Sequence, residues 1–208
     1  MLLIGQFDSP FVRRIGITLE LYGIAYDHSP LSVFRNADEL ARYNPLRRVP
    51  TLVLDDGEVL IESAAIVDYL DERVGRDAAM IAPSGAERRK ALKIVSLSTG
   101  LSDKAVALIY ERVLHETTSQ AWIERCRGQV AAVLDALEAE RAARTGPFLF
   151  GEKIGHADIA LGCALRFLRE GHPALFDASA RPALAAHNAR CEDLPAFRKI
   201  QQAFIPPA

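Results

Sequence analysis

The chain has 208 residues, of which half are apolar and a quarter are charged, a composition typical of a globular protein with a buried core. Its formal net charge of -2 at pH 7 gives no electrostatic reason to expect a nucleic acid or an anionic membrane surface as a partner. No run approaches the roughly 18 apolar residues that a membrane span needs. Residues 1–7 lack a basic leader, so we also expect no signal peptide.

Three cysteines, Cys126, Cys163 and Cys191, are widely spaced and form no CxxC pair. This pattern predicts neither a disulfide framework nor a zinc site, and each cysteine falls in an apolar helical pattern, as a small core residue does. His115 and His172 lack the paired spacing of metal ligands, so we expect no metal. These features favour a reducing, cytoplasmic location.

Strand-like and helical patterns alternate at the start of the chain. Residues 2–4 predict a strand, and residues 11–22 have the apolar period of a helix that ends at Gly23. A second strand is expected to begin at residues 24–26. A strand, a helix and a strand in so short a stretch favour a parallel pair with a right-handed crossover.

Two extended runs follow, over residues 51–54 and 58–61, and the Asp-Asp-Gly between them is typical of a tight hairpin turn. Residues 63–74 return to helical spacing and close at Gly75. A Pro-Ser-Gly sequence then marks residues 76–85 as a linker.

Every later apolar pattern is helical. Stripes of helical period run through residues 94–108 and 122–137, and the strongly apolar stretch 154–168 predicts a helix at the centre of a bundle. We therefore predict an α/β domain over residues 1–75, a linker over 76–85 and an all-α domain over 86–208.

A Ser9-Pro10-Phe11 motif stands at the start of the first helix. Ser9 suits the N-cap and Pro10 the first helical position, which explains both residues without any chemistry. The same geometry places a hydroxyl and free backbone N–H groups at the positive end of a helix, where they stabilise an anion. Ser9 is therefore also a candidate catalytic residue.

Three further motifs lie at element boundaries. Val49-Pro50 precedes a strand and resembles a cis-proline corner, with an ordinary turn as the alternative. Glu62-Ser63 opens the helix over residues 63–74, where Ser63 suits the N-cap and Glu62 the positive helix end. Asp158 begins the central bundle helix, where we expect it to satisfy the helix start and to have no catalytic role.

In their order and position, these four motifs resemble the cytosolic glutathione S-transferase family, and the resemblance covers nearly the whole chain. It implies a thioredoxin-like N-terminal domain followed by an all-helical one, glutathione as co-substrate, and a homodimer. Two positions depart from the family pattern. Arg47 stands where glycine is common and is interpreted as a surface charge, with an altered site rim as the alternative. Gly155 replaces the usual capping hydroxyl.

The resemblance implies that Ser9 donates a hydrogen bond to the glutathione thiolate. A hydrogen bond to a charged group contributes about 1.5–3 kcal/mol, which corresponds to a fall of about one to two units in the pKa of the thiol. Related glutathione-dependent reductases have a cysteine at this position and form a mixed disulfide there. A serine cannot do so, and thiol–disulfide exchange is therefore disfavoured.

The remaining glutathione contacts are also implied by the resemblance. The backbone of Val49, exposed by cis-Pro50, would pair with the cysteinyl unit like a short added strand. Arg48, in place of the usual lysine, would bind the glycine carboxylate. Glu62 would bind the γ-glutamyl ammonium, and Ser63 with nearby N–H groups would bind the γ-glutamyl carboxylate.

The electrophile site is expected between the domains, with Phe7, Phe11, Ala107 and Tyr110 as candidate lining residues. Core packing is an equal or better explanation for Phe11. Asp103 either reaches the glutathione ammonium across a dimer interface or is a solvated helix charge.

The sequence thus predicts a glutathione transferase that conjugates the glutathione thiolate to a small, largely apolar electrophile. One alternative keeps the same glutathione site for isomerisation, peroxide reduction or dehalogenation. Another is a non-catalytic binding module. The presence of the expected site residues disfavours it: Ser9, Arg48, Glu62 and Ser63.

Overall fold

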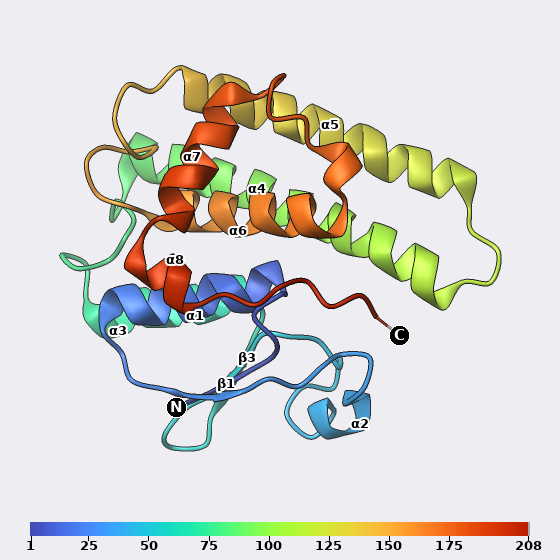
Figure 1. The fold of residues 1–208 in the computed structure, drawn as a ribbon. Helices are drawn as coiled ribbons and strands as arrows, with labels where there is room; N and C mark the ends of the chain where they lie inside the picture. Colours follow the sequence, from blue (N-terminus) through green and yellow to red (C-terminus); the bar gives the residue numbers. More distant parts are fainter. Residues whose placement is uncertain (208) are drawn as a thin grey trace.

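A computed structural model describes residues 1–207 of the chain. All four strands lie before residue 62, and the named elements after them are helices (Figure 1). The strands are β1 (Leu2–Ile4), β2 (Asp27–Ser29), β3 (Thr51–Val53) and β4 (Val59–Ile61). The first helices are α1 (Pro10–Tyr22), α2 (Ala37–Leu40) and α3 (Ser63–Val74).

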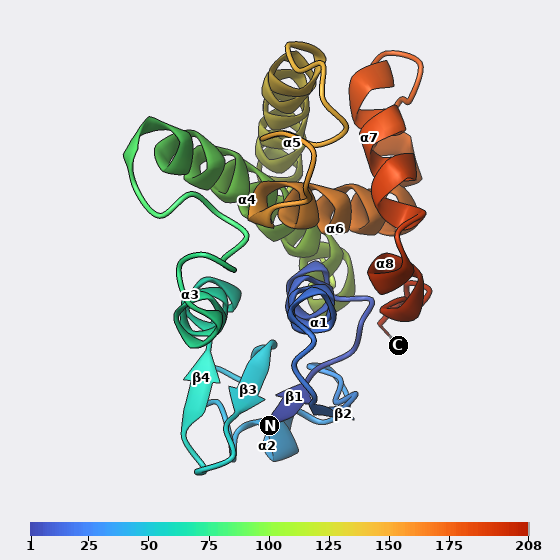
Figure 2. The same cartoon turned by 90° about the vertical axis from the view of Figure 1, so that its left-hand side faces the viewer.

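The four strands form one sheet in the order β2-β1-β3-β4. β1 is parallel to β2 and antiparallel to β3, and β3 and β4 form the antiparallel hairpin that the sequence predicts. Figure 2 shows α1 and α3 on the side of the sheet that faces the helical bundle. The core between the sheet and these helices is apolar, with Leu3, Ile15, Leu52, Ile66 and Leu70 fully buried. This architecture confirms the predicted thioredoxin-like domain.

The second strand begins later than predicted because the end of α1 uses the intervening residues. Gly23 adopts a left-handed conformation with φ 65°, and the N–H of Ile24 donates to the carbonyl of Leu19 at 3.0 Å. Ile24 and Tyr26 pack on the core cluster. Pairing with β1 therefore starts only at Asp27.

The second part of the chain is a bundle of helices. They are α4 (Gly85–Leu114), α5 (Gln120–Ala142), α6 (His156–Gly171), α7 (Pro182–Glu192) and α8 (Pro195–Lys199), with a short turn of 3₁₀ helix, η1, at Pro173–Leu175. α6 packs against α4, α7 and α1 and is buried over most of its length, so it lies at the predicted centre. Trp122 departs from the predicted stripe of α5: it is 37% exposed, and Lys104 lies over its ring.

A polar cluster joins the two parts of the fold. His156, at the start of α6, is buried and lies 2.7 Å from the carboxylate of Asp71 on α3. The hydroxyl of Tyr22 contacts both side chains and accepts a hydrogen bond from the N–H of Met80, in the connection between α3 and α4. Burial opposes ionisation of Asp71, but the hydrogen bond and charge of His156 lower its pKa below the usual value. These contacts fix the position of the bundle against the sheet domain.

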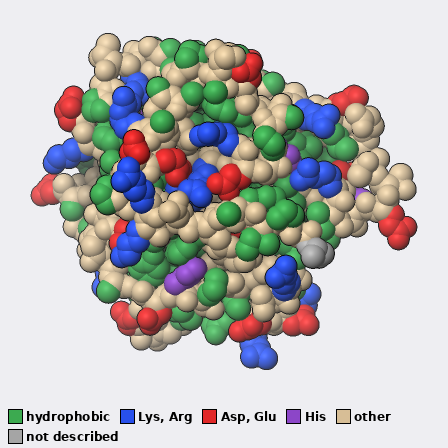
Figure 3. Space-filling model, in the orientation of Figure 1, with side chains coloured by type: hydrophobic (Ala, Val, Ile, Leu, Met, Phe, Trp, Pro, Cys, Tyr) green, Lys and Arg blue, Asp and Glu red, His purple; other side chains and the backbone are tan. Residues whose placement is uncertain are grey.

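Figure 3 shows acidic and basic side chains interspersed over one face of the molecule, with apolar side chains between them. The three cysteines are buried and free, as expected of core residues. Among residues 1–207, no helix combines the length and the apolar character that crossing a membrane requires.

Candidate functional site

Ser9 lies where the loop after β1 turns into α1. Its backbone is extended, with φ -67° and ψ 125°, and its Oγ accepts a hydrogen bond from the N–H of Val12 at 3.4 Å. Pro10 is the first helical residue, so the predicted N-cap is confirmed. A hydroxyl that accepts one hydrogen bond still has its own hydrogen to donate. Ser9 can therefore offer a donor at the positive end of α1.

The Val49-Pro50 bond is cis, as the motif predicts, and it lies next to the end of β1. Gly5 makes this approach possible: it has φ +128°, and a Cβ there would lie 2.5 Å from Val12 Cγ2 and 2.8 Å from Val49 Cβ. No side chain fits in this gap. The end of β1 is thus held between α1 and the cis-proline corner, which brings the Ser9 and Val49 segments together.

Asn44 holds the loop that leads to this corner, a role that sequence reasoning did not assign. Its side chain is buried, donates to the carbonyl of Arg48 at 2.9 Å and accepts from the N–H of Leu46 at 3.0 Å. The available signal was its place in the Asn-Pro-Leu sequence, because an asparagine side chain commonly bonds to the backbone of a turn. Asn44 thereby fixes the backbone just before Val49.

Glu62, and not Ser63, occupies the N-cap position of α3, and its side chain makes no capping hydrogen bond. Glu62 has φ 68° and ψ 128°, outside the helix, and Ser63 is the first helical residue. The Ser63 hydroxyl is buried and accepts a hydrogen bond from Arg14 Nη1 at 3.2 Å. The predicted N-cap role of Ser63 is therefore wrong, because its side chain turns inward to meet α1.

Arg14 is a residue of the site that sequence reasoning missed. Its side chain is 4% exposed, it forms no ion pair with a carboxylate of the described residues, and its Nε lacks a partner there. Burial lowers the pKa of Arg14 to about 10, which still leaves it charged at neutral pH. The available signal was a pair of adjacent arginines inside an otherwise largely apolar helical segment.

Arg48 and Glu62 form an ion pair at 3.3 Å at the mouth of the cleft, and both side chains are about half exposed. Such a pair contributes only about 0–1 kcal/mol, so either partner can exchange it for a ligand charge. Asp103 on α4 faces the same cleft; burial raises its pKa, Arg48 opposes that rise and Glu62 adds to it. Whether Asp103 reaches glutathione across a dimer stays a prediction.

The conformation of Arg47 explains why glycine suits this position. Its φ is +51°, in the left-handed region that glycine adopts without strain. Its guanidinium pairs with Asp38 at 3.3 Å, and both side chains are exposed. This arrangement fits the interpretation of Arg47 as a surface charge.

An apolar cavity opens beside Ser9 and Val49, between the two parts of the fold. Phe11 of α1, Phe34 of the loop after β2, and Val106 and Tyr110 of α4 contribute to its wall. Phe167 of α6 and residues 204–207 complete it. Phe34 meets the Tyr110 ring edge-on, with centroids 5.2 Å apart. Burial raises the pKa of Tyr110, so its hydroxyl stays protonated at neutral pH.

The structure brings Phe11 and Tyr110 to this cavity but neither Phe7 nor Ala107, which corrects two expected lining residues. The ring of Phe7 stacks on His28, with centroids 3.9 Å apart, and packs in the core clusters on either side of α1. Ala107 follows Val106 on α4, and of these two residues only Val106 lines the cavity.

A more polar cleft continues from the cavity past Arg48 and Asp103. Arg14, Glu62 and Ser63 line it, together with His156. The apolar cavity and the charged cleft thus form one continuous depression, with Ser9 on the apolar side.

Asp158 lies outside this depression and is fully buried. Its two carboxylate oxygens accept hydrogen bonds from the N–H groups of Leu149, at 2.8 Å, and Gly155, at 2.9 Å. It satisfies the start of α6 as predicted, although Gly155 supplies no hydroxyl in return.

Both parts of the chain match known family models. Residues 3–78 match the glutathione S-transferase N-terminal domain, and residues 120–190 match the glutathione S-transferase C-terminal domain. The chain belongs to the glutathione S-transferase family. It is 30% identical over 169 residues to an uncharacterized GST-like protein, YibF, of Escherichia coli K12, covering 81% of this chain and 82% of that protein. It is also 30% identical over 172 residues to a maleylacetoacetate isomerase of Pseudomonas aeruginosa, covering 77% and 78%.

Solved structures of glutathione S-transferases resemble the whole chain. One from Methylobacterium radiotolerans, in complex with glutathione sulfonate, is 25% identical with a TM-score of 0.89, covering 98% of this chain and 97% of that one. A family member from Pseudomonas fluorescens Pf-5 with bound glutathione is 30% identical with a TM-score of 0.83, covering 98% and 99%.

Proposed function

We propose that this family member is a transferase that joins the thiolate of glutathione to a small, apolar electrophile. The observation that carries the proposal is the position of Ser9. Its hydroxyl stands at the N-terminus of α1 and on the wall of an apolar cavity, next to the cis-proline corner. A thiolate held there has a hydrogen-bond donor on one side and space for an apolar partner on the other.

Glutathione is proposed to lie along the depression, with its cysteinyl unit paired to the backbone of Val49 beside cis-Pro50. Arg48 then takes the glycine carboxylate, and Glu62 takes the γ-glutamyl ammonium once their mutual ion pair opens. The backbone N–H groups at the start of α3, with Ser63, take the γ-glutamyl carboxylate. Similar proteins solved with bound glutathione support glutathione as the ligand.

The chemical step needs only an activated thiolate and alignment. Ser9 donates a hydrogen bond that stabilises the negative sulfur, and the positive end of α1 adds to the effect. The sulfur forms a bond to the electrophilic carbon. The displaced electron pair leaves with a halide or moves to a conjugated oxygen, which takes a proton from water. No covalent bond to the protein forms, because the nucleophile belongs to glutathione.

A second candidate is isomerisation of a cis double bond, favoured by the similarity to maleylacetoacetate isomerases. There the thiolate adds to the conjugated bond, the new single bond rotates, and elimination restores the thiolate. Such an acidic substrate would favour a cationic cavity, yet Arg35 and Arg48 at this cavity are balanced by Asp8 and Asp103. The charge balance and the aromatic wall therefore rank conjugation first.

A homodimer is also proposed, on the family resemblance. Leu92 on α4 is 42% exposed and lies beside residues of α3 in the charged cleft, which provides an apolar contact for a second copy. Light scattering after size-exclusion chromatography tests this part of the proposal.

Turnover with two classes of electrophile tests the proposed reaction. Purified protein and glutathione would be mixed with a chlorodinitrobenzene, which reports conjugation, and separately with a cis-enedione dicarboxylate, which reports isomerisation. Conjugation that exceeds the uncatalysed rate and falls in Ser9→Ala supports the transferase. Isomerisation without conjugation would reverse the order of the two candidates.

A further inference from the structure

Residues 201–207 form an extended segment that follows α8 and runs along α1 (Figure 1). It contains no helix or strand. Its last described residues, 204–207, line the apolar cavity. Because the segment has no internal hydrogen bonds to hold its shape, its position depends on contacts with the rest of the fold.

Three hydrogen bonds from backbone N–H groups to side-chain oxygens hold the segment in place. The N–H of Phe7 donates to Gln202 Oε1 at 3.1 Å. The N–H of Phe204 donates to Glu170 Oε2 at 2.8 Å. The N–H of Ile205 donates to Asp8 Oδ2 at 3.2 Å. Phe7 and Asp8, in the loop before α1, thus hold the segment on one side. Glu170, near the end of α6, holds it on the other.

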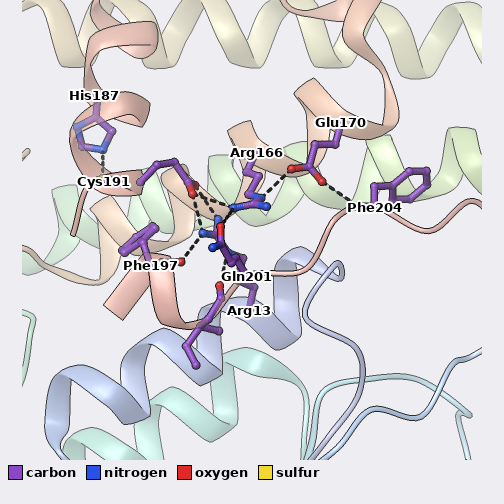
Figure 4. A network of polar contacts seen from close by, with 10 residues as sticks. Arg13, Arg166, Glu170, His187, Cys191, Phe197, Gln201 and Phe204 are labelled. Carbon is purple, nitrogen blue, oxygen red and sulfur yellow. Dashed lines mark hydrogen bonds and ion pairs between the residues drawn. The ribbon is translucent and has the colours of Figure 1, made fainter. Parts of the chain in front are cut away.

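Glu170 is itself held by a chain of ion pairs, shown in Figure 4. Arg166 lies 2.8 Å from Glu170 and 3.0 Å from Glu192. Glu192 in turn accepts two hydrogen bonds from buried Arg13 on α1, at 2.7 and 2.8 Å. The acceptor for the N–H of Phe204 is therefore fixed before any ligand arrives.

Arg13 also fixes the start of the segment. Its Nε donates to the carbonyl of Ile200 at 2.8 Å, and its Nη2 donates to the carbonyl of Phe197 at 3.1 Å. The residues just before position 201 are thus tied to α1, and the chain leaves them in a defined direction.

The side chains of the segment add an apolar wall. Phe204 meets the Phe167 ring edge-on, with centroids 5.6 Å apart, and packs on the bundle core. Ile205 is 42% exposed and lines the cavity next to Pro206 and Pro207, whose rings restrict the backbone. An apolar group attached to a sulfur near Ser9 would meet this wall within the same cavity.

We propose that Phe204 and Ile205 are specificity-determining residues that set which apolar groups on the glutathione sulfur are bound, and that Glu170 positions them. This inference rests on the proposed function, because it assigns the cavity to the group that the sulfur carries. It goes further by assigning selectivity to two residues after α8 and a positioning role to a carboxylate outside the cavity.

Binding of S-alkyl glutathiones tests the inference without requiring turnover. Glutathione and its S-methyl, S-butyl and S-hexyl derivatives would be titrated by calorimetry into the full-length protein and into Phe204→Ala. Each methylene buried against the wall strengthens binding by about fourfold. Phe204→Ala is therefore expected to weaken S-hexylglutathione by at least about tenfold and to leave glutathione itself within about twofold.

Phe176→Ala is the matched control, because Phe176 packs on the same bundle core but lies outside the cavity. It should lower stability and leave the chain-length profile unchanged. Ile205→Ala provides a second variant whose side chain is exposed enough to spare the fold, with an expected loss of about fourfold for the S-hexyl derivative.

Glu170→Ala and Glu170→Gln test the positioning role. The alanine variant removes the acceptor for the Phe204 N–H and is expected to reduce the preference for S-hexylglutathione over glutathione. The glutamine variant keeps an acceptor oxygen and should restore most of it. Glu138→Ala is the control. Like Glu170, Glu138 is a carboxylate that accepts hydrogen bonds from backbone N–H groups, but its two donors lie at the start of α7, away from the cavity.

The outcomes separate this inference from the proposed function. If the wild-type protein binds none of these compounds, the proposed glutathione site fails, and the inference fails with it. If glutathione binds but Phe204→Ala and Ile205→Ala keep the wild-type chain-length profile, the wall does not select the apolar group. That result overturns the inference and leaves the proposed function standing.

Discussion

The guanidinium of Arg14 donates a hydrogen bond to the hydroxyl of Ser63 at 3.2 Å, although the two residues belong to different helices and both are buried. The contact joins the start of α1 to the start of α3, the two helix ends at which the thiolate and the γ-glutamyl carboxylate are proposed to bind. A buried cation without a carboxylate partner is costly unless an anion approaches it.

Arg14→Met is therefore expected to weaken glutathione binding. The substitution removes a charge that faces the proposed carboxylate site, and a hydrogen bond to a charged group contributes about 1.5–3 kcal/mol. The dissociation constant measured by calorimetry should rise at least about tenfold. The free energy of unfolding should change little or increase, since the buried charge has no ion-pair partner to lose.

Arg13→Met is the matched control on the same helix. Arg13 pairs with Glu192, so its loss should lower the free energy of unfolding by about 3 kcal/mol. Its effect on glutathione affinity should be smaller than that of Arg14→Met. Wild-type affinity in Arg14→Met would contradict the role assigned to that residue.

Gly5→Ala should damage both stability and the site. The residue has φ +128°, and the added Cβ would lie within 3 Å of side-chain atoms of Val12 and Val49. Backbone strain of this kind costs about 1–3 kcal/mol, and the clash adds to it. Urea unfolding should show a larger loss than in Gly57→Ala, where φ is +91° but no atom lies within 4 Å. Equal losses in the two variants would show that the packing at Gly5 contributes nothing.

Burial of His187 predicts a loss of stability in acid. Its side chain is fully buried, its Nδ1 accepts from Arg141, and its Nε2 faces Asp158 and Cys191. Burial lowers the pKa of His187 to about 4, whereas a histidine in the unfolded chain has a pKa of about 6.5. The unfolded state therefore binds more protons in this window, and the free energy of unfolding falls as the pH falls from about 6.5 to about 4.

Unfolding by urea at a series of pH values checks this prediction. The wild-type protein should lose of the order of 3 kcal/mol across that window from this group. His187→Gln should be less stable at neutral pH but less dependent on pH. A variant with the same pH dependence as the wild type would show that other groups dominate the acid response.

Local sequence rules account for much of the fold. Four features depend only on neighbours within a few residues. They are the start of α1 at Pro10, its end at Gly23, the cis bond at Pro50 and the hairpin around Gly57. Such signals are readable because capping, turn and proline geometry act over a short range of the chain. The central position of α6 was readable for a different reason, since a helix that is apolar nearly all round must be buried.

Long-range contacts account for what the sequence did not reveal. The Ser63 hydroxyl turns inward because Arg14, 49 residues earlier, lies beneath it. Phe204 and Ile205 enter the cavity wall because Glu170 and Asp8 accept hydrogen bonds from their N–H groups. No period or motif records such pairings. Which residues of α4 reach the cavity also depends on contacts between elements that are distant in the sequence.

The most direct test of the central claim is a pH titration of bound glutathione, followed by the ultraviolet absorbance of its thiolate, in the wild-type protein, Ser9→Ala and Ser32→Ala. Ser32 also lines the cavity, so its variant controls for loss of a nearby hydroxyl. We expect the bound thiol to have a pKa about one to two units below that of a free thiol in the wild type and in Ser32→Ala. The pKa should return toward the free value in Ser9→Ala. An ordinary pKa in the wild type, or an equal depression in Ser9→Ala, would contradict the role of Ser9 as the thiolate-stabilising residue.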